Sequence, residues 1–380
     1  MRDVVIVGGG PAGSATAVHL ARRGIDVEIL EQGSFPRRKA CGEGLFSGGA
    51  AELLELGVLD DVAAASMRLT SMRFRLGDTV AEAPLPDSTA PHLGVRRDVL
   101  DTRLAQAVVE AGATLSTGVQ VRALARGTHG FALDTTDGVR EARVIIAADG
   151  INSRLRRDAG LQRASRSDRY GISAHLRLSG EVPPRIEVIA EDVFELYFTP
   201  VGEGLVNIAM LFRSGLARRF KGSPAPEFAA LLRQTGIEGE LVDEPLMAGP
   251  FPAEATALFN ENLVLCGDAA GFFDPITGEG MSHALRSAHL CADAVSSYLK
   301  DGNREAFAGY ARRQRAMERN PTLLARLMLF LAAHQTLGHR VLFNLRDEPD
   351  TLTKLIAINN GSAGFADLRP RDFAAMLLGR

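Results

Sequence analysis

The sequence lacks several features that would define its class at once. Its 380 residues include no tryptophan and three cysteines, Cys41, Cys266 and Cys291, too few and too far apart for a disulfide framework or a four-thiolate zinc site. A formal net charge of -3 gives no electrostatic reason to expect nucleic acid as a partner. The longest apolar run, residues 323–333, contains Arg326 and is shorter than the ~20 residues that cross a bilayer. We therefore expect a globular, cytoplasmic protein, of a length typical of two domains.

A β-turn-α-β pattern occupies the first 31 residues. Residues 4–7 form a short apolar run typical of a buried parallel strand, and residues 26–31 return to strand character after a helical stretch. In the turn between them, Gly8 permits the tight bend, Gly10 leaves room for a pyrophosphate and Gly13 lets helix and strand pack closely. N–H groups at the start of the helix favour phosphate. The predicted dinucleotide contacts are Gly8, Gly10, Pro11, Ala12 and Gly13.

Glu31 ends the second strand, 18 residues after Gly13. An acidic side chain there can accept hydrogen bonds from both hydroxyls of an adenosine ribose, so a free 2′-hydroxyl is expected, as in FAD or NAD. The neighbouring Gln32 is included among the predicted contacts.

A basic, glycine-punctuated loop at residues 35–45 follows this unit. Its side chains are expected to hold the pyrophosphate from its open side, and the alternative is a solvated run of charge. The contacts predicted from this loop are Arg38, Lys39, Ala40 and Cys41.

The rest of the chain alternates between strand and helix patterns. Residues 67–86 predict a hairpin, a helix is expected after Gly94, and further strands are expected at 114–121, 131–135 and 144–148. Four strand-like segments predict an antiparallel sheet, at residues 172–178, 186–190, 194–198 and 205–212. A strand at 262–266 precedes Gly267-Asp268, a helix follows Gly280, and the chain from about residue 304 is expected to be helical with a break near 344–350.

Three separated motifs together resemble the FAD-dependent oxidoreductases that join para-hydroxybenzoate hydroxylase-type monooxygenases with geranylgeranyl reductases. They are the dinucleotide turn with Glu31, Asp149-Gly150, and Gly267-Asp268 followed by residues 275–280. The resemblance implies an α/β fold, α+β overall, with a Rossmann-like FAD-binding domain, an antiparallel substrate domain and a helical C-terminal region. The boundaries expected are 1–66, 91–165 and 257–300 for the FAD-binding domain, 67–90 and 166–256 for the substrate domain, and 301–380 for the helical region.

The resemblance also assigns roles to residues. It implies that Asp268 binds the ribityl chain, that Arg97 reaches the pyrophosphate, and that Asp149-Gly150 supports FAD and NAD(P)H. A helix opening at residues 278–281 would direct its N-terminus at the flavin, where its dipole favours the negative charge of the reduced ring. The further cofactor contacts implied are Val121, Gly267, Pro275, Gly278, Glu279, Gly280 and Met281. Since the chain has one dinucleotide turn, NADH or NADPH is expected to dock transiently over the flavin, unless a partner reductase supplies electrons.

Three flavin chemistries compete with a fourth possibility of no turnover. Similar halogenases carry a Trp-x-Trp-x-Ile-Pro element and an active-site lysine, whereas this chain has no tryptophan and no lysine between Lys39 and Lys221. Geranylgeranyl reductases have a cysteine-glycine element, which Cys41-Gly42 resembles, and a Tyr-x-Trp-x-Phe-Pro segment, from which residues 194–200 depart. The favoured interpretation is an NAD(P)H- and O₂-dependent monooxygenase that hydroxylates a lipophilic aromatic or polyketide-like molecule. The alternatives are prenyl-chain reduction and a non-catalytic flavin redox sensor, and the predicted substrate contacts are Phe194, Tyr197 and Pro200.

Cys41 is the predicted catalytic residue, with a packing role under the flavin as the alternative. No histidine pair shows a metal-ligand spacing in a plausible site, so no metal is expected, and His283 and His289 are assigned to surface or core. Residues 323–331 predict a buried helix, with a tunnel roof or a weak membrane-surface contact for a lipophilic substrate as the alternative. The sequence leaves the oligomeric state open.

Overall fold

The structure, a computed structural model, describes residues 1–128, 130–164, 168–220 and 222–378. Its first layer is a six-stranded sheet in which β1 (Arg2–Val7) lies between β2 (Val27–Glu31) and β12 (Ala142–Ala147). Both pairings are parallel. The sheet continues to β8 (Thr114–Thr117) on one side and to β22 (Leu263–Leu265) and the antiparallel β21 (Phe259–Asn260) on the other.

Helices cover this sheet because its central strands are apolar on both faces. Val4, Val5 and Ile6 are completely buried, as a parallel strand that is covered on both faces requires. The helix α1 (Pro11–Ala21) follows β1 directly and packs against α4 (Arg97–Glu110) and α8 (Gly280–Asp301). The shorter helices here are α2 (Ser47–Glu55), α3 (Leu59–Ala64) and α5 (Arg154–Asp158). The predicted βαβ unit and the helices after Gly94 and at Gly280 are confirmed.

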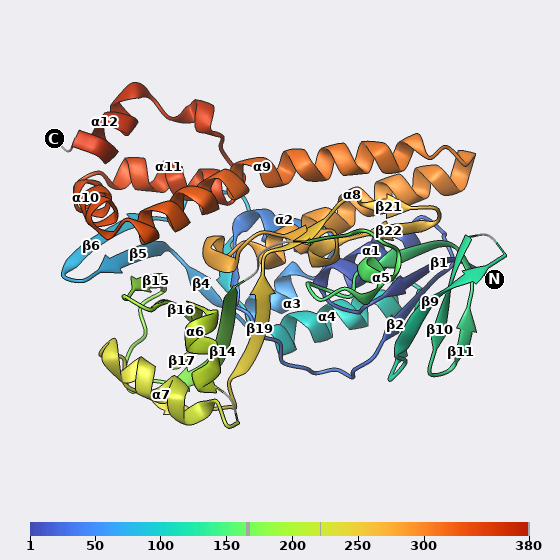
Figure 1. The fold of residues 1–380 in the computed structure, drawn as a ribbon, viewed down its shortest axis with the longest axis horizontal. Coiled ribbons are helices and arrows are strands. Elements are labelled where there is room, and N and C mark those ends of the chain that lie inside the picture. Colours follow the sequence, from blue (N-terminus) through green and yellow to red (C-terminus); the bar gives the residue numbers. More distant parts are fainter. Residues whose placement is uncertain (129, 165–167, 221, 379–380) are drawn as a thin grey trace.

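A second, larger sheet lies beside the first layer (Figure 1). Its strands, in spatial order, are β18 (Glu240–Leu241), β14 (Arg169–Arg177), β17 (Leu205–Arg213), β16 (Phe194–Gly202), β15 (Arg185–Ala190), β5 (Ser71–Leu76) and β6 (Thr79–Pro84). β19 (Leu246–Phe251) pairs with β14 along the same edge as β18, near the start of β14. The predicted antiparallel sheet and hairpin are confirmed, with one difference: β5 pairs with β15 in parallel, which brings the hairpin into this sheet. One face carries α6 (Ser214–Ala217) and α7 (Ala225–Gln234).

Three small sheets complete the strand content. They are β9 (Val121–Gly127) with β10 (Gly130–Thr135) and β11 (Gly138–Arg140), then β3 (Gly44–Leu45), β7 (His92–Gly94) and β4 (Met67–Leu69), and then β13 (Gln162–Arg163), β20 (Ala253–Ala255) and β23 (Gly271–Phe272). The strand predicted at 114–121 is therefore β8 alone, and Val121 begins another sheet. The predicted domain boundary at residues 165 and 166 lies outside the described residues, and the division into domains stays a prediction.

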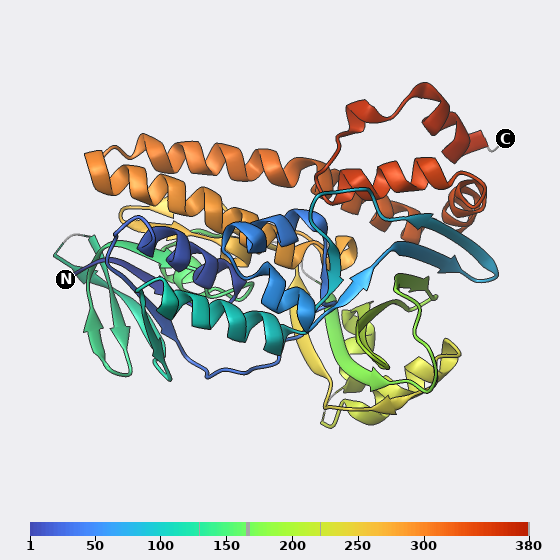
Figure 2. The same cartoon turned by 180° about the vertical axis from the view of Figure 1, so that it is seen from behind.

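The C-terminal region is helical, as predicted; its first helix runs along α8, and later helices pack on the hairpin end of the large sheet (Figure 2). It consists of α9 (Glu305–Ala333), α10 (Gln335–Leu345), α11 (Pro349–Asn359) and α12 (Pro370–Leu378), with the predicted break between α10 and α11. Residues 323–331 are helical, as predicted, but the prediction that this helix is buried is wrong. Leu324 is buried, but Leu323, Leu327 and Phe330 are 47%, 40% and 50% exposed, because α9 packs by one face and turns the other outward. Among the described residues, none of the helices has the length and apolar content to span a membrane.

Candidate functional site

The glycine-rich turn between β1 and α1 leaves no space for side chains. Gly8 has φ +103°, and a Cβ there would overlap the carbonyl oxygen of Ala148, at the end of β12. A Cβ on Gly13 would overlap the carbonyl oxygen of Gly8. The first turn of α1 contains no acidic residue, so its free N–H groups and positive dipole end are available to an anion. The tight bend predicted at Gly8 and the close packing predicted at Gly13 are therefore confirmed, and the room for a pyrophosphate predicted at Gly10 stays a prediction.

Glu31 lies beside this turn as an ionised carboxylate. Its Oε2 accepts the N–H of Gly9 at 2.7 Å, its Oε1 accepts the N–H of Gly33 at 2.8 Å, and Arg37 lies 2.6 Å away. Burial alone would raise the pKa of Glu31, but the Gly33 N–H and Arg37 outweigh it, so that the pKa is lowered. Gln32, next to it, is exposed. A fixed negative charge at the end of β2 is the group expected to bind ribose hydroxyls.

Arg37 connects Glu31 to a second pair of charges. Its Nε lies 3.3 Å from Asp101, which is completely buried, and the guanidinium of Arg97 donates to the same carboxylate at 2.8 and 3.0 Å. Burial alone would lower the pKa of Arg97, but the charge of Asp101 has the larger effect and raises this pKa. The resemblance implied that Arg97 reaches the pyrophosphate. The sequence analysis did not predict a role for Arg37 or for Asp101, although Asp101 lies four residues after Arg97 on α4.

Arg38, the next residue, contacts the large sheet instead. Its guanidinium pairs with Asp243 at 2.8 Å and donates to the carbonyl oxygen of Glu244 at 3.0 Å. The structure thus assigns Arg38 to the joint between the two layers, and its predicted cofactor contact stays a prediction. Ala40 is half-buried and Lys39 is exposed in the same loop, where Lys39 lowers the pKa of Asp268 by its charge.

The Gly267-Asp268 turn packs directly on the start of α1. Gly267 has φ +60°, and a Cβ there would lie 2.6 Å from the Cβ of Ala12. Burial raises the pKa of Asp268 to about 6, and Arg97 and Lys39 hold it from rising further. Two motifs that are more than 250 residues apart in the chain therefore meet at one edge of the parallel sheet, where open α/β folds bind their ligands.

Asp149-Gly150 lies at the same edge, after β12. The Asp149 Oδ2 accepts the backbone N–H groups of Arg154 at 2.8 Å and Leu155 at 3.2 Å, which open α5. Its Oδ1 is buried and has no hydrogen-bond partner among the described residues. The Oδ2 atom thus has a structural role, and within the described ranges the Oδ1 atom has none.

The segment at residues 275–281 turns into α8 beside Phe46 and Phe272. Gly278 has φ +68°, its Cβ position lies 3.7 Å from the ring of Phe46, and Gly280 faces Phe272 at 3.4 Å. Pro275 opens the turn and Met281 is buried behind it. Glu279 is 1% exposed, and neither carboxyl oxygen has a hydrogen-bond partner within the described chain. Burial raises the pKa of Glu279 to about 8, so this group is a protonated donor at neutral pH.

The large sheet is bonded to this segment through Tyr197 and Arg169. The Tyr197 hydroxyl donates to the carbonyl oxygen of Ile276 at 3.0 Å. Arg169, on β14, pairs with Asp274 at 2.8 Å and with Glu195 at 2.9 Å. Of the predicted substrate contacts, Tyr197 therefore borders the site.

The other two predicted substrate contacts lie elsewhere on β16. Phe194 is 3% exposed in the core cluster with Phe228 of α7, on the face opposite to Tyr197. Pro200 is buried, and its carbonyl lies against Gly94. Both substrate contacts stay predictions, and the packing of Phe194 in the core does not favour its contact with a substrate.

Cys41 sits where the basic loop contacts the large sheet. Its backbone N–H donates to the Ser173 hydroxyl at 3.1 Å, and its sulfur accepts the N–H of Glu43 at 3.4 Å. Burial raises the pKa of the Cys41 thiol, and the charge of Arg97 offsets only part of this. Cys41 is therefore a neutral thiol at physiological pH, which argues against a thiolate nucleophile.

A buried charge network fixes the loop next to Cys41. His175 of β14 lies 2.7 Å from Glu43 through Nε2 and 2.7 Å from Asp243 through Nδ1. Burial alone would lower the pKa of His175, but the two carboxylates raise it to about 9. Glu43 is held at φ 56°, a left-handed conformation rare for a residue with a side chain and often found at functional sites. Sequence reasoning missed His175 and Asp243, because nothing local indicates that they meet Glu43.

A cavity of about 320 Å³ opens between the Asp268 turn and α9. Its apolar side includes Phe272, Phe273 and Ala325, and its polar side includes Asp268 and Glu318. Burial raises the pKa of Glu318 to about 7. The cavity offers apolar walls next to groups that can hold or release a proton near neutrality.

These groups fit FAD on four structural grounds. The turn at Gly8 and Gly13 has no room for side chains, and Glu31 is a fixed carboxylate. Asp149 and Glu279 each hold buried oxygens that have no hydrogen-bond partner among the residues that the structure describes. Val121, among the predicted contacts, is partly buried against the same core.

Comparisons with known proteins agree with this assignment. A profile of the family described as "FAD binding domain" matches residues 1–322. The menaquinone reductase of Mycobacterium tuberculosis is 30% identical over 318 residues, which cover 78% of this chain and 76% of the relative. The digeranylgeranylglycerophospholipid reductase 1 of Methanothermobacter thermautotrophicus is 26% identical, over 79% of this chain and 78% of the relative.

Among solved structures, a flavoprotein/dehydrogenase from Cytophaga hutchinsonii has a TM-score of 0.81 at 22% identity and covers 95% of this chain and 93% of its own. A flavin-dependent brominase has a TM-score of 0.79 at 20% identity, covering 94% and 93%. At these identities the likeness concerns the fold. The sequence match over residues 1–322 and the geometry of the turn, Glu31 and Asp268 lead to one conclusion: the chain belongs to the FAD binding domain family and is an FAD-dependent oxidoreductase.

Proposed function

We propose that this protein uses FAD to reduce a carbon–carbon double bond of an isoprenoid lipid. The observation that carries the proposal is the position of Cys41, a neutral thiol beside Arg97 whose backbone N–H donates to the Ser173 hydroxyl of the large sheet. Reduction of a double bond requires a hydride and a proton. Bound FAD, once reduced, supplies the hydride, and a thiol that stays protonated at neutral pH is suited to supply the proton.

Two further observations support this substrate class. Menaquinone and digeranylgeranylglycerophospholipid, named in two relatives, are both lipids with isoprenoid chains. The cavity beside Asp268 has aromatic walls at Phe272 and Phe273, and α9 exposes Leu323, Leu327 and Phe330 nearby in the chain. We include in the proposal a weak contact of this α9 face with a membrane surface, from which the lipid would enter.

A second candidate function is hydroxylation of a lipophilic aromatic molecule with O₂. The observation that favours it is the departure of residues 194–200 from the tryptophan-containing segment of geranylgeranyl reductases. Either reaction needs a reduced flavin, and we propose NADH or NADPH as a transient donor. A redox sensor would bind FAD without turnover.

One experiment separates these functions. The FAD-loaded protein is mixed with NADH or NADPH under anaerobic conditions, bleaching of the flavin is recorded, and vesicles containing menaquinone or a geranylgeranyl lipid are then added. We expect a product that has gained two hydrogens, and sedimentation of the same samples to show protein bound to the vesicles. A product that has gained one oxygen in air, and none under anaerobic conditions, would instead establish the monooxygenase. If the bound flavin never turns over, the result would support the non-catalytic redox sensor.

Replacement of Cys41 tests its role as the proton donor. Cys41→Ala should slow turnover by roughly a hundredfold or more, the lower end of what a general acid contributes, with FAD still bound. The measurement is kcat together with the flavin spectrum, and Cys291→Ala, at a buried cysteine of α8, is the matched control. Equal turnover in the two variants would reduce Cys41 to a packing residue.

A further inference from the structure

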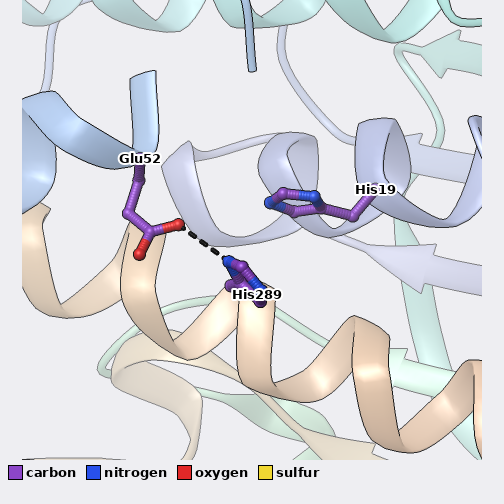
Figure 3. A group of neighbouring side chains, drawn as sticks. All are labelled: His19, Glu52 and His289. Carbon is purple, nitrogen blue, oxygen red and sulfur yellow. Dashed lines mark hydrogen bonds and ion pairs between the residues drawn. The ribbon is translucent and has the colours of Figure 1, made fainter. Parts of the chain in front are cut away.

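A group of metal-ligating side chains lies away from the flavin site, at the junction of three helices. His19 comes from the last turn of α1, Glu52 from α2 and His289 from α8 (Figure 3). One ligand atom from each lies within 4.8 Å of the other two. Tetrahedral zinc, with bonds of about 2.0–2.1 Å, needs ligand atoms about 3.4 Å apart, so small side-chain rotations would close the group.

His19 provides an independent sign of a ligand. The side chain is 6% exposed, and its Nε2 is buried without a hydrogen-bond partner in the described structure. Figure 3 shows the ring directed from α1 toward His289, and the two ring centroids are 4.9 Å apart. A buried imidazole nitrogen without a partner is costly.

The surroundings of His289 resemble the outer shell of a metal site. Its Nδ1 lies 3.1 Å from Glu52 and 3.3 Å from Glu55, and its Nε2 lies 3.9 Å from Asp293. Asp293 is in turn held by Arg23 at 2.8 Å. A histidine that binds a metal through one nitrogen commonly directs the other at a carboxylate, which fixes the ring.

We propose that His19, Glu52 and His289 form a binding site for a divalent transition metal of the zinc class. Two imidazoles and a carboxylate are the ligands that zinc prefers. The side chains of Glu52 and His289 are 18% and 29% exposed, so water can complete the coordination. The metal would tie together α1, which begins at the Gly8 turn, and α8, which begins at Gly280. Its effect would therefore be to stabilise the frame of the flavin site.

The test uses the full FAD-loaded chain after treatment with a chelator. Zn²⁺ and Co²⁺ are titrated separately, with calorimetry for stoichiometry, visible absorption for Co²⁺ coordination, and thermal unfolding. We expect one metal per chain, absorption typical of four-coordinate Co²⁺, and a Tm that rises by about 3 °C at saturation. His289→Gln and Glu52→Gln should each weaken binding at least tenfold, and His334→Gln, at an exposed histidine outside the group, should not.

The flavin spectrum and the Tm of each metal-free variant show whether it has folded. If His289→Gln does not fold, Glu52→Gln still tests the proposal. Absence of stoichiometric binding would overturn the proposal. So would binding that is equally strong in Glu52→Gln, His289→Gln and the control, because the metal would then lie elsewhere on the surface.

Discussion

Gly8→Ala should yield a protein that no longer retains FAD. Gly8 has φ +103°, and the new Cβ would overlap the carbonyl oxygen of Ala148, so the turn must open to accept it. Overpacking against backbone together with the left-handed conformation costs about 2–4 kcal/mol of folding free energy. The opened turn also withdraws the N–H groups of α1 from the phosphates. We expect FAD affinity to fall by roughly a hundredfold, measured by flavin fluorescence during titration of the apoprotein with FAD.

Gly215→Ala is the matched control for this substitution. Gly215 lies in α6, no atom of the described part of the chain lies within 4 Å of its Cβ position, and its φ is not left-handed. The control should bind FAD as the unsubstituted protein does and change the unfolding free energy by less than about 1 kcal/mol. If Gly8→Ala remained yellow with unchanged affinity, the turn would not be the phosphate site.

The βαβ unit was predictable because its signals are local. The apolar residues 4–7, the glycines and Glu31 all lie within one short stretch, and each has a single structural task. The parallel pairing of β5 with β15 was not predictable in the same way. Their partners are more than 100 residues apart, and no local pattern distinguishes a parallel from an antiparallel neighbour.

Side-chain direction explains most of what sequence reasoning missed at the site. A basic loop predicts positive charge near the turn, but not that Arg37 would face Glu31 while Arg38 faces Asp243. Strand alternation, in contrast, could have separated Phe194 from Tyr197, because residues three apart on a strand point to opposite faces. The alternation of strand residues is a local signal, and the sequence contains it.

Buried networks assembled from distant elements were beyond sequence reasoning. Glu43, His175 and Asp243 come from a loop, β14 and the segment before β19, and His19 and His289 are 270 residues apart. Each residue taken singly is an ordinary polar residue. Only the packing of the large sheet on the basic loop, and of α1 on α8, shows that they meet.

The network around His175 makes the stability of the protein depend on pH in a specific direction. The pKa of His175 is raised to about 9 in the folded protein, against about 6.5 in an unfolded chain. Its stabilisation is therefore fully present below pH 6.5 and is lost as the pH rises through 9. The difference corresponds to about 3 kcal/mol, and the side chain is only 9% exposed, so solvent screens it little.

His175→Gln removes this charge and leaves Glu43 and Asp243 close together without a cation between them. We expect the variant to be about 3 kcal/mol less stable than the unsubstituted protein at pH 6 in urea unfolding, with the difference nearly gone by pH 10. His334→Gln, at an exposed histidine, controls for the loss of one imidazole. A difference between His175→Gln and the unsubstituted protein that stays constant from pH 6 to pH 10 would show that His175 is not the titrating group. Because the same network fixes the backbone at Glu43, two residues from Cys41, turnover should fall over the same pH range as stability and should no longer do so in the variant.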